Sequence, residues 1–97
     1  MNTVCDSSTL IALAKIGHLK ILKKIVKNLI IPPSVYEEVV IKGAGKSGSA
    51  EIGKAQWIEK RQASDRELVM RLNSILHYGE SEAIALAKEI RADLIIL

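Results

Sequence analysis

Residues 3–15 read TVCDSSTLIALAK and contain the transition that decides the fold. The first three residues form an apolar run that predicts a short buried strand, and Asp6 follows directly. Ser7 or Ser8 is expected to cap a helix, because a hydroxyl can accept a hydrogen bond from the first helical turn. Apolar residues then recur at helical spacing as far as Gly17. The stretch therefore predicts a strand leading into a helix, with a carboxylate at the junction.

The same alternation of strand and helix continues along the chain. Apolar runs predict further strands at 29–31 and 94–97, and Trp57-Ile58 predicts a short edge strand. Helical spacing predicts helices over residues 19–26, from Pro33, over 50–55, 64–76 and 80–90. Strands that alternate with helices pair in parallel through right-handed crossovers. The sequence therefore predicts an α/β fold, a three-layer sandwich with a central parallel sheet, formed by one domain over residues 1–97.

Local signals predict how some of these elements begin and end. Two capping boxes are expected, in which a hydroxyl and a carboxylate three residues apart bind each other's backbone: Ser34 with Glu37, and Ser64 with Glu67. Gly79 is expected to end the helical stretch at 64–76 and to separate it from the last helix. Residues 42–49 read KGAGKSGS and predict a surface loop.

Composition narrows the class of protein. Hydrophobic residues make up 48% and charged residues 26%, the balance of a soluble globular domain. No apolar run approaches the roughly 18–20 residues of a membrane span, and the N-terminus does not resemble a signal peptide. Cys5 is the single cysteine, so an internal disulfide is excluded. A cytoplasmic protein without a membrane partner is therefore the default expectation.

The charge balance is compatible with an anionic partner. The net charge is +3, which suits nucleic acid, although aromatic residues are too few, at 3%, for a base-stacking platform. Lysines at positions 20, 23, 24 and 27 share one helix face, which is more typical of a solvated surface than of an RNA track. Gly45-Lys46-Ser47 is not a phosphate loop, because Val40 stands where that motif needs glycine.

Three acidic residues are expected to meet at one end of the sheet. Ligands of open parallel sheets bind beyond the carboxyl ends of the strands. Asp6 follows the first strand, Glu38 lies on the helix after the second, and Glu80 begins the helix before the last. Their mutual repulsion would be relieved by a hard cation such as Mg²⁺ or Mn²⁺. The alternatives are that Asp6 only caps a helix, and that Glu80 and Glu82 only favour a helix N-terminus.

Three segments resemble the motifs of a known family, the PIN domain. They are residues 6–14 (DSSTLIALA), 31–39 (IPPSVYEEV) and 79–87 (GESEAIALA), the last followed by 92–97 (ADLIIL). They occur in the family's order and span nearly the whole chain. The resemblance is strongest to the subgroup related to the toxin nucleases of toxin–antitoxin pairs.

The resemblance implies a metal-dependent ribonuclease with Mg²⁺ or Mn²⁺ as cofactor. It assigns catalysis and metal binding to Asp6, Glu38 and Glu80. Glu82 matches the motif less well than Glu80, but it is expected to share the metal through water. Ser8 matches a small hydroxyl residue that positions the substrate. The family pattern also has a fourth acid immediately after the last strand, together with a further helix and strand. The domain is therefore expected to be incomplete at its C-terminus.

Two functions follow as hypotheses. The first is an endoribonuclease of PIN type, the toxin of a pair, with RNA as substrate and an antitoxin-like protein as partner. The second is a truncated or degenerate PIN domain with little catalysis, which acts by binding protein or RNA. An uncovered sheet edge would expose apolar surface, so a homodimer is expected as well.

Overall fold

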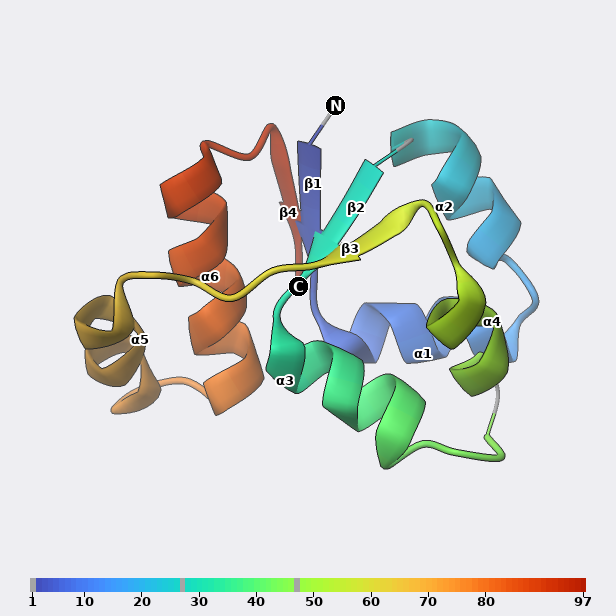
Figure 1. Ribbon diagram of the computed structural model, residues 1–97, viewed down its shortest axis with the longest axis horizontal. Helices are drawn as coiled ribbons and strands as arrows, with labels where there is room; N and C mark the ends of the chain where they lie inside the picture. The colour runs from blue at the N-terminus through green and yellow to red at the C-terminus, as the bar shows by residue number, and fades with distance from the viewer. Residues whose placement is uncertain (1, 27, 47) are drawn as a thin grey trace.

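Four parallel strands form the central sheet of the computed structural model, which describes residues 2–26, 28–46 and 48–97 (Figure 1). In the order in which they pair, the strands are β3 (Ile58–Lys60), β2 (Asn28–Ile31), β1 (Asn2–Cys5) and β4 (Leu94–Ile96). All three pairings are parallel. The carboxyl ends of the strands therefore lie at one edge of the sheet, as the sequence predicted.

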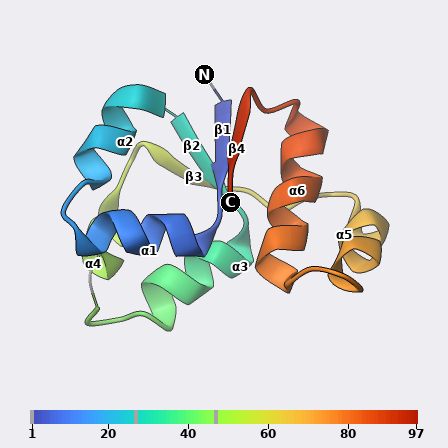
Figure 2. The same ribbon diagram turned by 180° about the vertical axis from the view of Figure 1, so that it is seen from behind.

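Helices cover both faces of this sheet (Figures 1 and 2). On one side lie α5 (Arg66–Asn73) and α6 (Tyr78–Ile90), and on the other lie α1 (Ser7–Lys15), α2 (Leu19–Val26) and α4 (Ser49–Lys54). Below the carboxyl edge runs α3 (Pro33–Tyr36), which continues without a break as a π-helical segment, η1 (Glu37–Ile41).

Alternation along the strands divides the core into two layers. Cys5, Leu29 and Ile31 pack with buried residues of α1, α2 and α3. Val4 and Ile30 point to the opposite face and pack with buried residues of α5 and α6. A parallel sheet that is buried on both faces forms the middle layer of a sandwich. The predicted three-layer α/β fold is therefore confirmed.

Several predicted helix boundaries were wrong in detail. The cap of α1 is Asp6, whose carboxylate accepts the backbone N–H of Thr9, and not Ser7 or Ser8. The cap of α5 is likewise Asp65. A neighbouring carboxylate takes the cap position in both cases, and Ser7 and Ser64 bind other partners.

The two predicted capping boxes are not formed. Ser64 binds the carboxylate of Glu89 through its backbone N–H, at 2.8 Å, and through its hydroxyl. Ser34 lies inside α3, which begins after Pro32, and its buried hydroxyl has no hydrogen-bond partner among the described residues. Gly79 does not precede the last helix but lies in its first turn. Similarly, Ser49 belongs to α4 rather than to the predicted loop.

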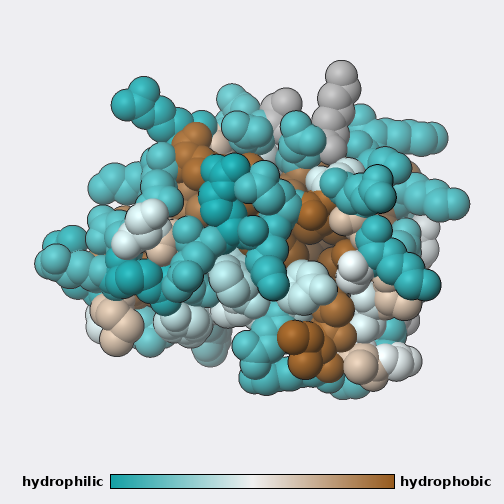
Figure 3. Space-filling model, in the orientation of Figure 1, coloured by the Kyte–Doolittle hydropathy of each residue, from teal (hydrophilic) through white to brown (hydrophobic). Residues whose placement is uncertain are grey.

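Some large apolar side chains remain at the surface. The face shown in Figure 3 is mostly hydrophilic, with apolar surface over the lower end of the α3–η1 helix, which carries the exposed Ile41. Leu94 on the edge strand β4 and Leu97 after it are exposed as well. Self-association through this edge stays a prediction. In the part of the chain that the structure describes, no helix combines the length and the apolar character that crossing a membrane requires.

Candidate functional site

A small cavity of about 160 Å³ lies at the carboxyl edge of the sheet. Three elements border it: the start of α1, the segment η1 and the start of α6. The residues that line it are Asp6, Ser7, Ser8, Glu38, His77, Gly79 and Glu80. The structure therefore brings together the three carboxylates and the hydroxyl of Ser8 that sequence analysis selected from distant positions. We call this space the acid cavity.

Asp6 is anchored at the centre of the sheet. Its backbone N–H donates to the carbonyl of Ile96 at 3.0 Å, which ties the end of β1 to the neighbouring strand β4. Its side chain is only 5% exposed, and Oδ1 accepts the Thr9 N–H at 3.1 Å. Both readings of Asp6 therefore describe its position: it caps α1 and also lines the acid cavity.

Glu38 reaches the acid cavity from the π-helical segment. The widened turn is closed by a 2.8 Å hydrogen bond from the N–H of Lys42 to the carbonyl of Glu37, five residues earlier. Oε2 of Glu38 accepts a 2.7 Å hydrogen bond from the hydroxyl of Ser7. Glu37 instead lies 3.8 Å from the ammonium of Lys42 at the surface. Such π turns are frequent at functional sites.

Two contacts hold the end of this segment in place. The hydroxyl of Ser49 donates to the carbonyl of Val40 at 2.9 Å. Gly43 passes so close to the preceding turn that a Cβ added there would lie 2.4 Å from the carbonyl oxygen of Val39. A side chain at position 43 would therefore clash with the backbone of η1, the segment that carries Glu38.

Glu80 belongs to the first turn of α6. Its Oε1 accepts the backbone N–H of His77 at 3.3 Å, so it caps the helix on which it lies. His77 itself lines the acid cavity. Sequence analysis missed His77 because a lone histidine has no ligand spacing. The available signal was its position two residues before the third motif at Gly79.

Glu82 is not among the residues that line the acid cavity. It is 2% exposed, and its Oε2 lies 2.8 Å from the guanidinium of Arg66, with the hydroxyl of Tyr78 at 3.4 Å. The hydrogen bond to Glu82 raises the pKa of Arg66 above its ordinary value. Glu82 was expected to share the metal through water, and the structure pairs its carboxylate with Arg66.

Apart from His77, the polar side chains of the acid cavity are carboxylates and hydroxyls. Carboxylates and hydroxyls are the ligands that Mg²⁺ and Mn²⁺ prefer, so the donor set fits a hard divalent cation. Over residues 2–26, 28–46 and 48–97, however, no three His, Cys, Asp or Glu side chains are gathered closely enough to hold an ion already. An ion between Asp6, Glu38 and Glu80 would therefore require side-chain rotation. Asp93 lies at the opposite edge of the sheet, where its Oδ2 accepts the N–H of Asn2.

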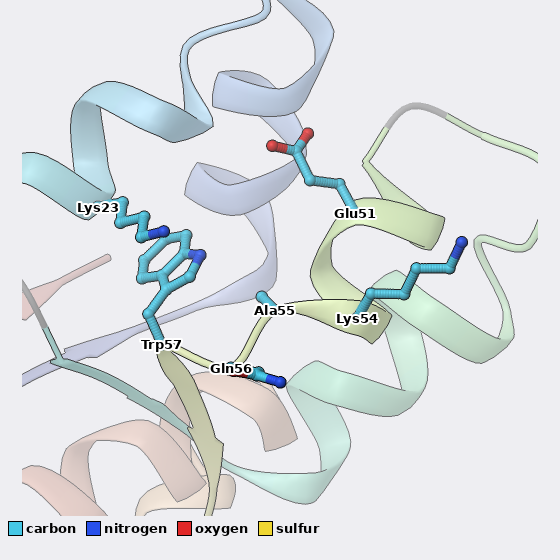
Figure 4. Close-up of a pocket in the computed structure, with 6 residues that line it drawn as sticks. All are labelled: Lys23, Glu51, Lys54, Ala55, Gln56 and Trp57. Atoms are coloured by element: carbon cyan, nitrogen blue, oxygen red, sulfur yellow. The ribbon is translucent and has the colours of Figure 1, made fainter.

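A larger cavity, of about 660 Å³, lies next to the amino end of β3. Figure 4 shows its lining, which includes Trp57, Lys23 on α2, and Glu51 and Lys54 on α4. Glu51 supplies its single carboxylate, and in Figure 4 the charged ends of Glu51 and Lys54 diverge. Without converging acids this cavity is a weaker candidate for metal-dependent chemistry than the acid cavity.

Comparison with known proteins agrees with this geometry. A family model, DUF3368, described as a PIN domain, matches residues 2–97. No curated protein matches the chain, and no solved structure matches it. PIN domains are in general nucleases that use divalent metal ions. The family model covers nearly the whole chain and includes every residue of the acid cavity, so the chain belongs to the PIN domain family.

Proposed function

We propose that this PIN domain is a metal-dependent endoribonuclease that holds Mg²⁺ or Mn²⁺ between Asp6, Glu38 and Glu80. One observation carries the proposal: these carboxylates come from three separate elements and line one cavity at the carboxyl edge of a parallel sheet. Ligands of such sheets bind at this edge.

The hydrogen bonds of the three carboxylates support a role as ligands. Among the described residues, each uses one oxygen as an acceptor: Oδ1 of Asp6, Oε2 of Glu38 and Oε1 of Glu80. These bonds anchor one oxygen of each side chain and leave the second for a cation, toward which the side chain would have to rotate. Ligand carboxylates in metal sites are typically oriented by hydrogen bonds of this kind.

The positions of Asp6 and Ser8 suggest a separate role for each residue in catalysis. A bound divalent ion would supply positive charge that polarises the phosphate and activates water. Asp6, the most rigid of the three, would fix the site relative to the sheet. Ser8, exposed at the rim, would donate its hydroxyl to a phosphate oxygen of the substrate. The finer assignment, a toxin held by an antitoxin-like protein, rests on the motif resemblance.

A second function is supported by a separate observation. No group of three ligands is gathered around one point in the described ranges, and each carboxylate already has a partner within the fold. A PIN domain with little catalysis, which binds RNA or protein, is compatible with that arrangement.

Metal titration tests the first function directly. We expect Asp6→Asn, Glu38→Gln and Glu80→Gln each to weaken Mn²⁺ binding at least tenfold in calorimetry. Glu37→Gln is the matched control, since Glu37 neighbours Glu38 but does not line the acid cavity. Equal weakening by Glu37→Gln and Glu38→Gln would refute the assignment of the second ligand.

Cleavage of RNA decides between the two functions. The purified chain is incubated with single-stranded RNA in Mn²⁺, in Mg²⁺ and in EDTA. Cleavage that needs metal and disappears in Asp6→Asn supports the ribonuclease. Metal binding without cleavage supports the binding protein instead.

A further inference from the structure

A second cavity adjoins the acid cavity and carries the opposite charge. Its volume is about 460 Å³, and it lies between α1, η1 and the turn that follows η1. Three lysines line it, Lys15, Lys42 and Lys46, against a single carboxylate, that of Glu38. Ile11 supplies part of its apolar floor. We call it the lysine groove.

The lysine groove and the acid cavity meet at Glu38, which lines both. They also follow one another along α1, because Ser8 borders the acid cavity and Lys15 borders the lysine groove. Seven residues of helix separate these two positions, which corresponds to about 10 Å along the axis. A nucleic-acid backbone that enters the acid cavity therefore has a cationic continuation within reach of adjoining phosphates.

The lysines of the groove are largely free to bind an anion. Lys15 and Lys46 form no ion pair with the residues described in the structure. Lys42 lies 3.8 Å from Glu37, but the two side chains are 72% and 56% exposed. An ion pair that exposed is weak and easily exchanged for a phosphate.

The lysines of α2 are in a different place. Lys23 lines the cavity beside Trp57 at the amino end of β3 (Figure 4), which shares no lining residue with the acid cavity. Lys20 and Lys24 on the same helix are exposed and line neither the acid cavity nor the lysine groove, and Lys27 lies outside the described residues. The lysine face that the sequence singled out is therefore not the one beside the acids.

We propose that the lysine groove binds the phosphodiester backbone of single-stranded nucleic acid, next to the acid cavity. Ammonium groups recognise backbone phosphates without reading sequence. The choice of RNA as the natural ligand rests on the proposed function, whereas the recognition of phosphate rests on the groove alone.

Binding is measured by fluorescence anisotropy of a labelled single-stranded RNA oligonucleotide in EDTA, so that neither metal nor cleavage contributes. The groove variant is Lys15→Gln/Lys42→Gln/Lys46→Gln. The control is Lys20→Gln/Lys23→Gln/Lys24→Gln, which removes the same charge from α2. We expect the groove variant to bind at least tenfold more weakly, and the control to stay within about threefold of the parent. The slope of log K against log salt should fall by about 0.7 for each lysine that contacts a phosphate.

Further variants separate the outcomes. Arginine at all three groove positions should restore RNA binding, because the positive charge is kept. Circular dichroism checks that every variant is folded. Equal weakening by the groove variant and the control, or none in the groove variant, overturns the proposal. A DNA strand of the same sequence that binds equally well assigns the recognition to phosphate, and preference for RNA adds a contact to the 2′-hydroxyl. Loss of RNA binding in the groove variant of a chain that never cleaves RNA supports the groove and refutes the ribonuclease. Intact RNA binding by the groove variant of a chain that does cleave RNA refutes the groove and supports the ribonuclease.

Discussion

The hydroxyl of Ser7 donates a 2.7 Å hydrogen bond to Oε2 of Glu38 and so joins two residues that are 31 positions apart in the chain. It connects the start of α1, where Asp6 lies, with the π-helical segment. This bond therefore links two of the three elements that border the acid cavity.

Ser7→Ala should therefore weaken metal binding without unfolding the protein. Glu38 loses the partner that orients it, and loss of such an orienting partner typically costs about 10-fold or more in metal affinity. Stability should change by less than about 1 kcal/mol, because the bond lies at the surface. Mn²⁺ calorimetry measures the first effect and chemical denaturation the second. Ser8→Ala is the matched control, and equal Mn²⁺ affinity in the two variants would show that the bond has no orienting role.

Asp6 combines a structural and a chemical role, and two substitutions separate them. Asparagine caps helices about as well as aspartate, so Asp6→Asn should keep the stability of α1 while Mn²⁺ binding is lost. Asp6→Ala removes the acceptor of the Thr9 N–H and should cost roughly 1 kcal/mol in addition. Thermal denaturation compares the two variants. If Asp6→Asn proves as unstable as Asp6→Ala, the capping bond is not the source of the structural effect.

The order of strands and helices could be predicted because it depends on local patterns. The apolar, β-branched runs at 29–31 and 94–96 predicted strands, and both form strands, the first at the centre of the sheet and the second at its edge. The position of the acids followed from topology, since Asp6 directly ends a parallel strand. That reasoning required no knowledge of side-chain packing.

What the sequence did not predict depends on contacts between distant residues. The π turn at Glu37 and the ion pair of Glu82 with Arg66 are set by which elements meet, and no short pattern encodes them. The prediction that Ser7 or Ser8 caps α1 was wrong for another reason. Asp6, Ser7 and Ser8 are all good caps, and the hydrogen bond of Asp6 to the neighbouring strand decides between them.

Cys5 makes the stability of the fold sensitive to alkaline pH. Burial, with a smaller effect of the nearby Asp6 charge, raises the pKa of the Cys5 thiol from 9.0 to about 12. Below pH 9 the thiol is protonated in both the folded and the unfolded chain, so its contribution to stability is complete. Between about pH 9 and 12 the unfolded chain loses the proton and the folded chain keeps it, so the free energy of unfolding falls by roughly 1.4 kcal/mol per pH unit.

Denaturation as a function of pH measures this fall, and Cys5→Ala provides the control. Other groups also titrate at alkaline pH, but their effect is common to both proteins. The free energy of unfolding of the parent minus that of Cys5→Ala should therefore decrease as pH rises from 9 to 12. A constant difference over that range would show that the thiol does not stay protonated in the fold.

Gly48 is required both for its backbone conformation and for its contact with α1. Its φ is +84°, and an added Cβ would lie 2.4 Å from Cβ of Ala14. Gly45 has a similar φ of +83° but open space around it. Gly45→Ala should therefore lower the free energy of unfolding only by the backbone strain, about 1 kcal/mol. Gly48→Ala should lower it by roughly 1–3 kcal/mol more, which is the usual cost of overpacking. Chemical denaturation of both variants isolates the packing effect, and equal losses would contradict the close approach of Gly48 to α1.

The pair of Arg66 and Glu82 joins α5 to α6 and should contribute to stability rather than to metal binding. Glu82 is 2% exposed and depends on Arg66, so Arg66→Met leaves a carboxylate buried without its cation. Loss of one partner of a fully buried pair costs about 3–5 kcal/mol. The Arg66 side chain is 39% exposed, so water can replace part of the lost interaction and a smaller cost, roughly 1–3 kcal/mol, is expected.

The matched control is Arg71→Met, which removes a charge from an exposed position on the same helix and should cost less than about 0.5 kcal/mol. Glu82→Gln in the Arg66→Met background should recover part of the loss, because a neutral amide is less costly to bury without a cation. Mn²⁺ affinity should remain within about twofold in all three proteins, since Glu82 does not line the acid cavity. A large loss of Mn²⁺ binding in a folded Glu82→Gln variant would contradict this assignment and return Glu82 to the metal site.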